Sequence, residues 1–460
     1  MDDSSATAAT PVPHPLYGEV ERALLARWPE TRLDPSLDRI RALVDLLGEP
    51  QAGYPVIHLT GTNGKSSTSR MIDALLRTLG LRTGRYISPH LQSMTERISL
   101  DGRPLSEEQF VAAYGDVAAY LEVVDRSGRH PVSFFEALTA MAYAAFADAP
   151  VDVAIVEVGM GGSWDATNVA DGQVAVVTPI AVDHANYLGD NPADIAVEKA
   201  GILKPGAIGV LAEQSGEVAE VLLRRAAEVG ANVVREGVEF GVATRLAGVG
   251  GQLVTVRGLG REYDEIFLPL HGAHQAHNAA AAVAAVEAFV GGGAELDPAA
   301  VRAAFATVTS PGRLEVARRS PTFVLDCAHN PHGARATAEA VQEAFSFSPL
   351  IGVVGVMSDK DVEQMLAAFE PVLAEIVCTQ GSTARAMPAD EVGEVAEHMF
   401  GADRVHVASR LDDALDVAAG LAEAGGSFGE SLGSGGVLVT GSVVTVGEAR
   451  TLLGVSDGAI

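Results

Sequence analysis

The sequence predicts an α/β protein of two domains, each built around a mostly parallel sheet. Three observations support this prediction: short apolar runs rich in β-branched residues, helical segments between those runs, and a length of 460 residues. Strands that are buried on both faces of a parallel sheet have this composition. Because a single hydrophobic core seldom grows beyond about 250–300 residues, a chain of this length is expected to divide.

The first strand set is expected in the N-terminal part of the chain. Its apolar runs lie at residues 54–60, 82–88, 151–159, 173–180 and 207–212. Helical segments alternate with these runs, and they cover residues 65–80, 134–149, 216–230 and 274–293. This alternation predicts a doubly wound domain with a mostly parallel sheet and a phosphate-binding loop after its first strand.

A second strand set is expected in the C-terminal part, at residues 322–328, 350–358, 375–380, 404–409 and 436–442. It predicts a smaller, Rossmann-like α/β domain. We place the boundary at Ser310-Pro311-Gly312, where a proline and a glycine follow an alanine-rich helix. The predicted division is a disordered leader (1–17), a large domain (18–310) and a C-terminal domain (311–460).

Composition and charge exclude several classes of protein. The N-terminal segment is polar and lacks a basic-then-apolar signal pattern, and the chain has no apolar run of about 18 residues, so we expect neither secretion nor a membrane span. Two cysteines, Cys327 and Cys378, are too few for a disulfide framework, which is typical of a cytoplasmic protein. A net charge of −28 argues against a nucleic-acid surface.

The stretch VIHLTGTNGKSSTSR, residues 56–70, indicates a phosphate-binding loop of an unusual kind. Gly64-Lys65-Ser66 is present, but the position where the common motif has its first glycine holds Leu59, and Gly61 stands closer instead. A strand, two glycines and a helix start would allow backbone N–H groups and the helix dipole to face an anion. The alternative is a glycine turn that only begins an amphipathic helix.

Three further residues are candidates for chemistry at the same sheet edge. Glu157 ends an apolar strand, where a nucleotide-bound Mg²⁺ needs an oxygen ligand, although such an acid can also simply face water. His184 follows the next strand, and a lone histidine is often structural. Lys199 lies in a short helical segment, where it could instead be exposed and paired with Glu198.

Nine short motifs occur in an order that resembles the folylpolyglutamate synthase/dihydrofolate synthase family of the Mur ligase superfamily. The resemblance covers about residues 20–450, and the ordered set is far more specific than any one motif. The superfamily is known for a Gly-Thr-Asn-Gly-Lys loop that lacks the earlier glycine. The motifs are GTNGKSS, EVGMGGSWDATN, DHANYLG, EKAGILKPG, GAHQAHNAAAA, SPGRLEV, DCAHNPHG, MSDKD and VTGS.

The resemblance implies roles for the matching residues of an ATP and Mg²⁺ site. The implied phosphate ligands are Gly61, Thr62, Asn63, Gly64, Lys65 and Ser66, and the further ATP contacts are Asn278, Arg313 and Asp326. Two Mg²⁺ ions are implied, one held by Ser66, Ser88 and Glu157 and the other by His184. Lys199 matches a lysine that becomes carbamylated in the family, which requires its neutral amine.

The resemblance also implies a pterin pocket and a reaction centre. The implied pterin contacts are Phe134, Phe135, Glu136, Trp164, Asp165, Ala166, Arg32 and Asp34. His329 and Asn330 are expected to face the reaction centre, where His329 is a candidate base for the incoming amine and His332 is its competitor. Many relatives have arginine where this chain has Ser163, so a contact made by that arginine is in doubt.

The implied activity is an ATP-dependent ligase, active as a monomer, that adds L-glutamate to dihydropteroate, to reduced folates, or to both. ATP would phosphorylate the carboxylate, and the glutamate amine would displace phosphate from the acyl phosphate. One alternative is a peptidoglycan-type Mur ligase, but those enzymes usually carry a whole UDP-binding domain before the phosphate loop, and only 60 residues precede Gly61 here. Another is a nucleotide switch without ligase chemistry, which would leave Asn278, Arg313 and the 326–331 run unexplained.

Overall fold

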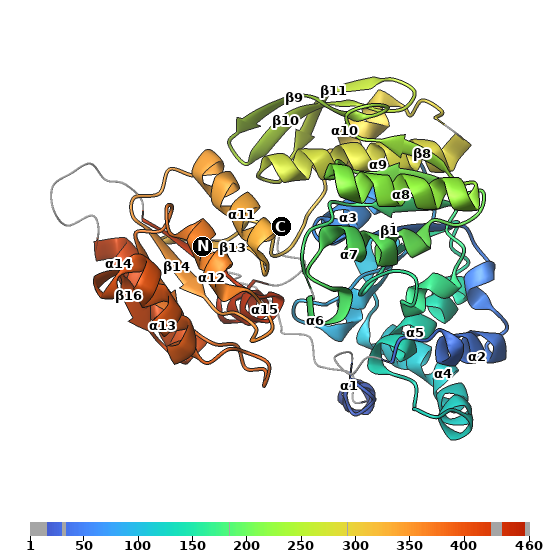
Figure 1. Cartoon of the computed structure of the whole chain (residues 1–460), viewed down its shortest axis with the longest axis horizontal. Coiled ribbons are helices and arrows are strands. Elements are labelled where there is room, and N and C mark those ends of the chain that lie inside the picture. The colour runs from blue at the N-terminus through green and yellow to red at the C-terminus, as the bar shows by residue number, and fades with distance from the viewer. Residues whose placement is uncertain (1–15, 30–33, 184, 292, 425–434, 456–460) are drawn as a thin grey trace, which may run out of the picture.

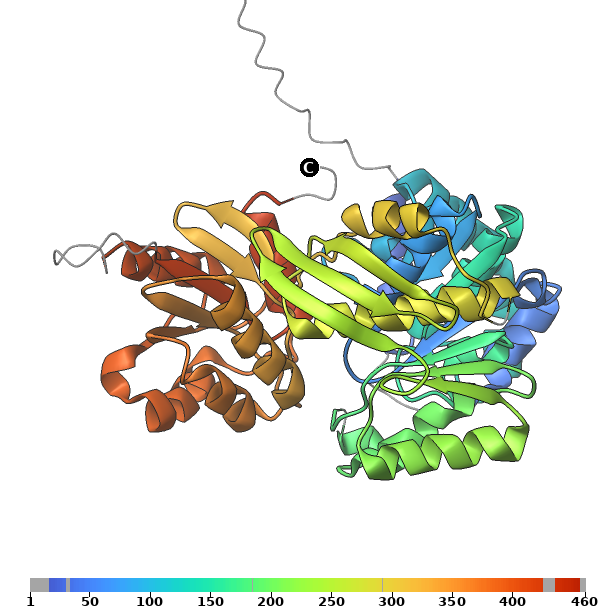
Figure 2. The same ribbon diagram turned by 90° about the horizontal axis from the view of Figure 1, so that it is seen from above.

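The structure is a computed structural model, and it describes residues 16–29, 34–183, 185–291, 293–424 and 435–455. The elements from α1 to α10 form one body, and those from β12 to α15 form a second body beside it (Figures 1 and 2). The predicted leader lies outside the described residues except at its last two positions, and helix α1 (Tyr17–Leu25) already begins at Tyr17.

The larger body is built on an eight-stranded sheet in the order β4-β3-β2-β5-β1-β6-β7-β8. Every predicted run of the first set contains a strand, namely β1 (Val56–Thr60), β2 (Thr83–Tyr86), β5 (Val153–Glu157), β6 (Val174–Val177) and β7 (Ile208–Leu211). These strands and β8 (Asn232–Arg235) are parallel, and β3 (Ile98–Leu100) and β4 (Arg103–Pro104) add an antiparallel edge. The predicted fold class is therefore confirmed.

Helices cover both faces of this sheet, as the alternation of buried side chains along β1 shows. Ile57 and Leu59 pack with α3 (Lys65–Thr78), α9 (Ala273–Gly291) and α10 (Pro298–Ala306). Val56 points to the opposite face, where it packs with α1, α2 (Asp38–Leu46), α4 (Glu107–Ser127) and α5 (Phe134–Asp148). Beyond them, α7 (Pro192–Lys199) and α8 (Gly216–Val229) cover the end of the sheet near β7, and α6 (Ala185–Leu188) precedes α7.

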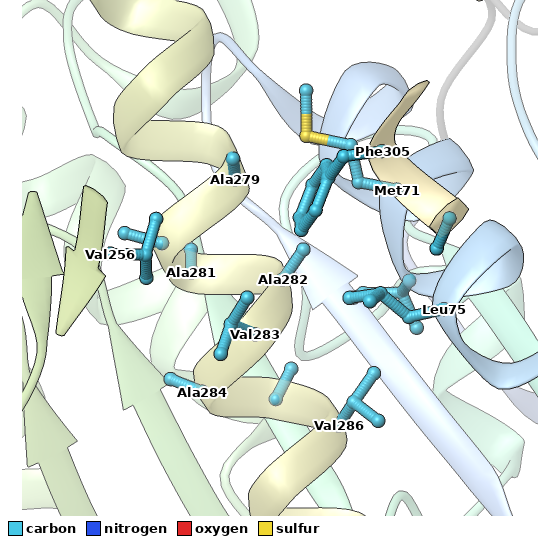
Figure 3. Close-up of a cluster of buried hydrophobic side chains, with 14 of the residues drawn as sticks. Met71, Leu75, Val256, Ala279, Ala281, Ala282, Val283, Ala284, Val286 and Phe305 are labelled. Atoms are coloured by element: carbon cyan, nitrogen blue, oxygen red, sulfur yellow. The ribbon is translucent and has the colours of Figure 1, made fainter. Parts of the chain in front are cut away.

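Helix α9 is buried along most of its length because its side chains are small. Figure 3 shows its alanines and valines between Val256 on one side and Met71, Leu75 and Phe305 on the other. Helices approach each other more closely where the contacting side chains are short. The second turn of α9, which carries Asn278, thereby lies against the start of α3.

A three-stranded antiparallel sheet lies over α9, and the sequence analysis did not predict it. It consists of β9 (Gly241–Gly248), β10 (Gly251–Arg257) and β11 (Glu262–Leu268), with β10 in the centre. Val254, Val256 and Ile266 face the core, whereas Leu253 and Phe267 are exposed. Apolar residues on both faces obscure the strict alternation by which a half-buried strand is predicted.

The smaller body contains a six-stranded sheet in the order β12-β13-β17-β14-β15-β16. The five predicted runs correspond to β13 (Thr322–Leu325), β14 (Leu350–Val354), β15 (Glu375–Cys378), β16 (Val405–Val407) and β17 (Gly436–Thr440). These strands are parallel, and β12 (Glu315–Arg319) pairs antiparallel with β13. The helices are α11 (Pro331–Ala344), α12 (Val362–Phe369), α13 (Ala389–Phe400), α14 (Leu411–Ala424) and α15 (Val443–Leu452).

Candidate active site

A cavity of about 410 Å³ lies at the carboxyl ends of β1 and β5, between the two bodies. In this sheet β2 and β5 lie on one side of β1, whereas β6, β7 and β8 lie on the other side. Ligands of open α/β sheets bind at the point where the strand order changes direction in this way. His184 and Arg32 lie outside the described residues. The predicted residues that line the cavity are Gly61, Thr62, Asn63, Gly64, Lys65, Ser66, Ser88, Glu157, Lys199, Asn278, Arg313, Asp326 and His329.

The loop between β1 and α3 can be built only with glycine at two positions. Gly61 has a φ of 141°, and a Cβ there would lie 1.9 Å from the Thr178 Oγ1 and 2.8 Å from its carbonyl oxygen. Gly64 has a φ of 88° and is the N-cap of α3, where a Cβ would lie 2.6 Å from the Asn278 Oδ1. The loop therefore curls tightly against the end of β6 and against α9, with the N-terminus of α3 facing the cavity.

Two lysines, the partly buried Lys65 and the buried Lys199, converge on one carbonyl of this loop. The Lys65 Nζ donates to the Gly61 carbonyl at 2.9 Å and to the Thr62 carbonyl at 3.2 Å, and the Lys199 Nζ donates to the same Gly61 carbonyl at 2.9 Å. Burial lowers the pKa of both amines, and together with the nearby Lys65 charge it brings the pKa of Lys199 to about 7. Lys65 is partly exposed and offers its ammonium group to an anion, whereas the buried Lys199 amine is partly neutral near pH 7.

Glu157 supplies a buried carboxylate directly beside the lysines. The Ser66 Oγ donates to both carboxylate oxygens of Glu157 at 3.0 Å. Burial raises the pKa of Glu157, while Lys65 and the Ser66 hydrogen bond act in the opposite direction. In the described ranges, no three His, Cys, Asp or Glu side chains cluster as a self-contained metal site. Mg²⁺ commonly takes only one or two protein oxygens and completes its shell with phosphate and water, so Ser66 and Glu157 fit it.

The smaller body contributes a second strand–loop–helix unit, from β13 to α11. The acid of this unit, Asp326, is hydrogen-bonded to three groups of the protein. Asp326 accepts hydrogen bonds from the Leu314 N–H at 3.0 Å, the Ala328 N–H at 2.9 Å and the Thr337 hydroxyl at 2.7 Å. These bonds fix the segment that carries Arg313 as well as the start of α11. Asp326 lines the cavity, but its carboxylate serves to hold the loops in place.

Polar side chains tie the two bodies together across the cavity. The Asn63 and Asn330 amides pair reciprocally, at 3.2 Å and 3.1 Å, and Asn330 also donates to the Asp183 Oδ2 at 3.1 Å. Lys360 forms a short ion pair with Asp183, and both side chains are almost completely buried. Sequence reasoning assigned no role to Asp183 or Lys360, although both stand inside motifs that it singled out.

His329, the predicted base, lines the cavity beside Asp183. Its Nδ1 lies 2.8 Å from the Cys327 carbonyl oxygen and its Nε2 lies 3.3 Å from the Asp183 Oδ2. The competitor, His332, accepts from the Asn63 amide at 3.0 Å through its Nδ1, and burial lowers its pKa.

The predicted pterin residues divide into aromatic side chains near the cavity and acids that hold the scaffold. Gly159 lines the cavity, and a Cβ built on it would lie 2.6 Å from the Phe135 ring. A Cβ built on Gly161 would lie 3.2 Å from the Trp164 ring. Phe134 lies under the Arg97 guanidinium at 5.0 Å. None of the described pterin candidates is among the lining residues of the cavity itself.

The acids among these candidates are occupied by neighbours in the scaffold. Glu136 accepts from the Ser133 N–H at 2.7 Å in a capping box of α5, and it pairs with Arg39 at 3.1 Å. Asp34 pairs with the same guanidinium at 2.6 Å. Asp165 accepts from the Met160 and Thr167 N–H groups and caps the turn that begins at Ala166. These contacts leave little of the buried Glu136 and Asp165 carboxylates for a ligand, whereas the Asp34 side chain is 45% exposed.

Ser163, at the position where many relatives have arginine, fastens its loop to α7. Its N–H and its hydroxyl both donate to the Glu198 carbonyl at 3.0 Å. A Cβ on Gly201 would lie 2.1 Å from the Ser163 Oγ, so the two segments are in close contact. The short side chain holds the glycine-rich loop beside Lys199.

Among the described residues, the structure contains no helix with the length and hydropathy of a membrane span.

Comparisons with known families agree with this site. Residues 59–286 match the Mur ligase middle domain, and residues 312–443 match the Mur ligase glutamate ligase domain. The two bodies and the cavity between them are thus those of an ATP-dependent ligase of the Mur type. The chain is 51% identical to dihydrofolate synthase/folylpolyglutamate synthase of Mycobacterium tuberculosis, over 98% of this chain and 97% of that protein. It belongs to the dihydrofolate synthase/folylpolyglutamate synthase family.

Solved structures place the family resemblance in three dimensions. The folylpolyglutamate synthase of M. tuberculosis complexed with ADP superposes with a TM-score of 0.92 at 52% identity, and the alignment covers 95% of this chain and 98% of that one. E. coli FolC in complex with DHPP and ADP gives a TM-score of 0.83 at 29% identity, over 97% and 98%. The predicted family, ligase class and ATP binding are therefore confirmed, and the two alternative classes of protein are not supported.

Proposed function

We propose that the protein joins L-glutamate to the carboxylate of dihydropteroate, of a reduced folate, or of both, and that it uses ATP to activate that carboxylate. The observation that carries the proposal is the glycine loop, whose Gly61 carbonyl accepts hydrogen bonds from Lys65 and Lys199 beside Glu157. A triphosphate is an anion, and the Lys65 ammonium group and the loop N–H groups offer it positive partners. The names of the relatives, and the DHPP and ADP in the E. coli neighbour, support the same substrates.

The first step needs phosphate transfer, which depends mainly on positioning and on neutralising charge. A carboxylate oxygen attacks the γ-phosphorus of ATP, the bond to the β-phosphate oxygen breaks, and ADP leaves. The N–H groups of the 61–66 loop hold the phosphates, and Lys65 exchanges the Gly61 and Thr62 carbonyls for phosphate oxygens. Mg²⁺, held by Ser66 and Glu157 with Ser88 nearby, would supply charge neutralisation at the phosphates.

The second step forms the amide. The glutamate amine attacks the acyl carbon, and the tetrahedral intermediate expels phosphate and loses a proton from nitrogen. Contacts between the bodies, such as the Asn63–Asn330 pair, restrict water that would otherwise hydrolyse the acyl phosphate. His329 lines the cavity and stays the candidate for the group that accepts the amine proton.

We also propose that Lys199 is carbamylated in the active enzyme. The neutral amine attacks CO₂ and releases a proton, which replaces a cation with a carbamate anion. A pKa of about 7 leaves a large share of the amine neutral at physiological pH, as this reaction requires. The anion would add to Glu157 in supporting a metal-bound phosphate. That the enzyme acts as a monomer in the cytoplasm stays a prediction from the sequence.

An ADP-release assay tests the proposed function. Purified protein is supplied with ATP, Mg²⁺, L-glutamate and either dihydropteroate or a tetrahydrofolate, and both ADP and the new amide are measured. We expect ADP release that depends on glutamate and on at least one acceptor, with one amide formed per ADP. ADP release that is indifferent to both substrates would contradict a ligase and would instead fit a nucleotide switch.

A further inference from the structure

A loop of the larger body reaches from the cavity into the smaller body. It spans residues 88–97 and begins at Ser88, which lines the cavity. At its tip, Leu91 packs against the hydrophobic core of the smaller body that contains Leu325 and Val446. Its backbone comes so close to α15 that a Cβ on Gly447 would lie 2.1 Å from the Leu91 carbonyl oxygen. The tip therefore contacts α15 at a position where only glycine, Gly447, leaves enough space for the Leu91 backbone.

Gln92 fastens this tip with both ends of its amide. Its Nε2 donates to the Thr451 hydroxyl at 3.0 Å and to the Val455 carbonyl at 3.2 Å. Its Oε1 accepts a short hydrogen bond from the Arg450 guanidinium. One exposed side chain of the larger body thus makes three hydrogen bonds to α15 and the residues after it.

The contact continues to the segment that connects the two bodies. Arg450 is almost completely buried, and it pairs with Glu315 through two hydrogen bonds, of 2.9 Å and 3.1 Å. Glu315 also accepts from the Gly312 N–H at 2.8 Å. Because Arg313 of the cavity is the next residue, the tip of the loop, α15 and the connecting segment form one hydrogen-bonded unit.

The loop is stiff enough to transmit a position from its tip to Ser88. The buried Glu96 accepts from three successive N–H groups, those of Leu91, Gln92 and Ser93, at 2.7–2.9 Å. At the other side of the loop, the Arg97 Nε donates to the His90 Nδ1 at 3.0 Å. A carboxylate that binds several backbone donors fixes a loop as a single body. Glu96 itself lines the cavity, so this rigid loop forms part of its wall.

We propose that the 88–97 loop is a coupling element, in which Gln92 is the positioning residue that seats the tip on α15 and thereby aligns Ser88 with the groups of the smaller body. The inference rests on the proposed function, because it concerns the transfer of an activated carboxylate to an amine. While the tip contacts α15, the wall of the cavity and the smaller body move together. The acyl phosphate then reacts with the amine faster than with water. With the tip released, phosphorylation continues but water intercepts the intermediate.

Two substitutions release the tip from opposite sides of the contact. Gln92→Ala removes the three hydrogen bonds of the amide. Gly447→Ala places a methyl group against the Leu91 carbonyl, while alanine is a better helix former than glycine within α15. The matched controls are Gln342→Ala, an exposed glutamine on α11, and Gly420→Ala, a glycine of α14 with no atom within 4 Å of the added methyl group.

The measurement is the ratio of ADP released to amide formed, together with kcat and the KM for ATP. We expect both release variants to lose about tenfold in amide formation, the worth of one or two lost hydrogen bonds, with an unchanged KM for ATP and more ADP than amide. A ratio of one and control-like rates in both variants would overturn the inference. If Gly447→Ala fails to bind ATP, Gln92→Ala decides alone. A wild-type enzyme that makes no amide would instead contradict the proposed function.

Discussion

The two strand–loop–helix units that face the cavity use buried charge in different ways. In the larger body, Lys65 and Lys199 share one loop carbonyl, and burial shifts the pKa of both amines. In the smaller body, Asp326 is as buried as Lys199 but receives three hydrogen bonds from its own surroundings. A buried charged group that makes few hydrogen bonds to the protein can bind a ligand, whereas one whose hydrogen bonds are all made within the protein stabilises the fold.

The largest effect should follow removal of the charge at the centre of the glycine loop. Lys65→Ala should lower the rate of amide formation by about 10³-fold or more, because a cation facing a transferred phosphate contributes on this scale. The measurement is kcat/KM for ATP in the ligation assay. Lys204→Ala is the matched control, since Lys204 bonds to Asn168 and Asp171 away from the cavity and its loss should leave the rate near that of the wild type. Equal rates in the two variants would remove Lys65 from the mechanism.

A smaller effect is expected at Lys199. Lys199→Ala should cost roughly 10²-fold in kcat, the typical cost of one electrostatic group, and a short carboxylate such as acetate should restore part of it. Because the pKa of Lys199 is about 7, the amine becomes protonated as the pH falls through this value and can no longer take up CO₂. Wild-type enzyme depleted of CO₂ should therefore regain activity with bicarbonate at pH 8 but hardly at pH 6. A response to bicarbonate that is the same at both pH values would argue against carbamylation.

Asp326 should affect stability more than catalysis. Asp326→Ala leaves the Leu314 and Ala328 N–H groups without their buried acceptor, which should cost about 2–4 kcal/mol in the free energy of unfolding. Urea denaturation gives this value, and calorimetric titration of the folded fraction should show ATP affinity close to that of the wild type. The Asp413→Ala variant, at an exposed position of α14, serves as the control. A loss of ATP affinity without a loss of stability would make Asp326 a direct ligand instead.

The smallest effect concerns the segment that connects the bodies. Gly312 has a φ of 65°, and a Cβ there would lie 2.7 Å from the Cys327 Sγ, so Gly312→Ala should shift the smaller body slightly. Gly230→Ala is the control, because its φ of 70° brings the same backbone strain, about 1–2 kcal/mol, into open space. We expect a several-fold loss of kcat at Gly312 with little change in ATP affinity. A parallel loss of kcat and of ATP affinity would argue that this segment does not act as a hinge between the two bodies.

Much of the fold and the phosphate site could be predicted because their signals are local. The glycines at 61 and 64, the lysine after them and the acid at the end of β5 all stand at fixed distances from a strand end. The Ser133–Glu136 capping box is equally local, and its Ser-x-x-Glu pattern could have assigned Glu136 to the scaffold. Resemblance to a family implied a set of pterin contacts, and it placed in that set acids such as Glu136 that the structure shows paired within the scaffold.

Other features could not be predicted because they join residues far apart in the chain. Asp183 meets Lys360 across 177 positions, and Gln92 meets Arg450 across 358. No periodicity or spacing within one segment encodes such a pair. The antiparallel sheet over α9 was missed for a different reason, since Leu253 and Phe267 are exposed on its outer face and blur the pattern of its strands.

In the proposed function, the glycine loop and Lys65 receive the triphosphate. A crystal structure with Mg²⁺ and a non-hydrolysable ATP analogue tests it most directly. The account predicts phosphate oxygens within hydrogen-bonding distance of the Lys65 Nζ, which will have left the Gly61 carbonyl, and of the N–H groups of the 61–66 loop. A nucleotide bound elsewhere, with Lys65 still on the Gly61 carbonyl, would contradict it.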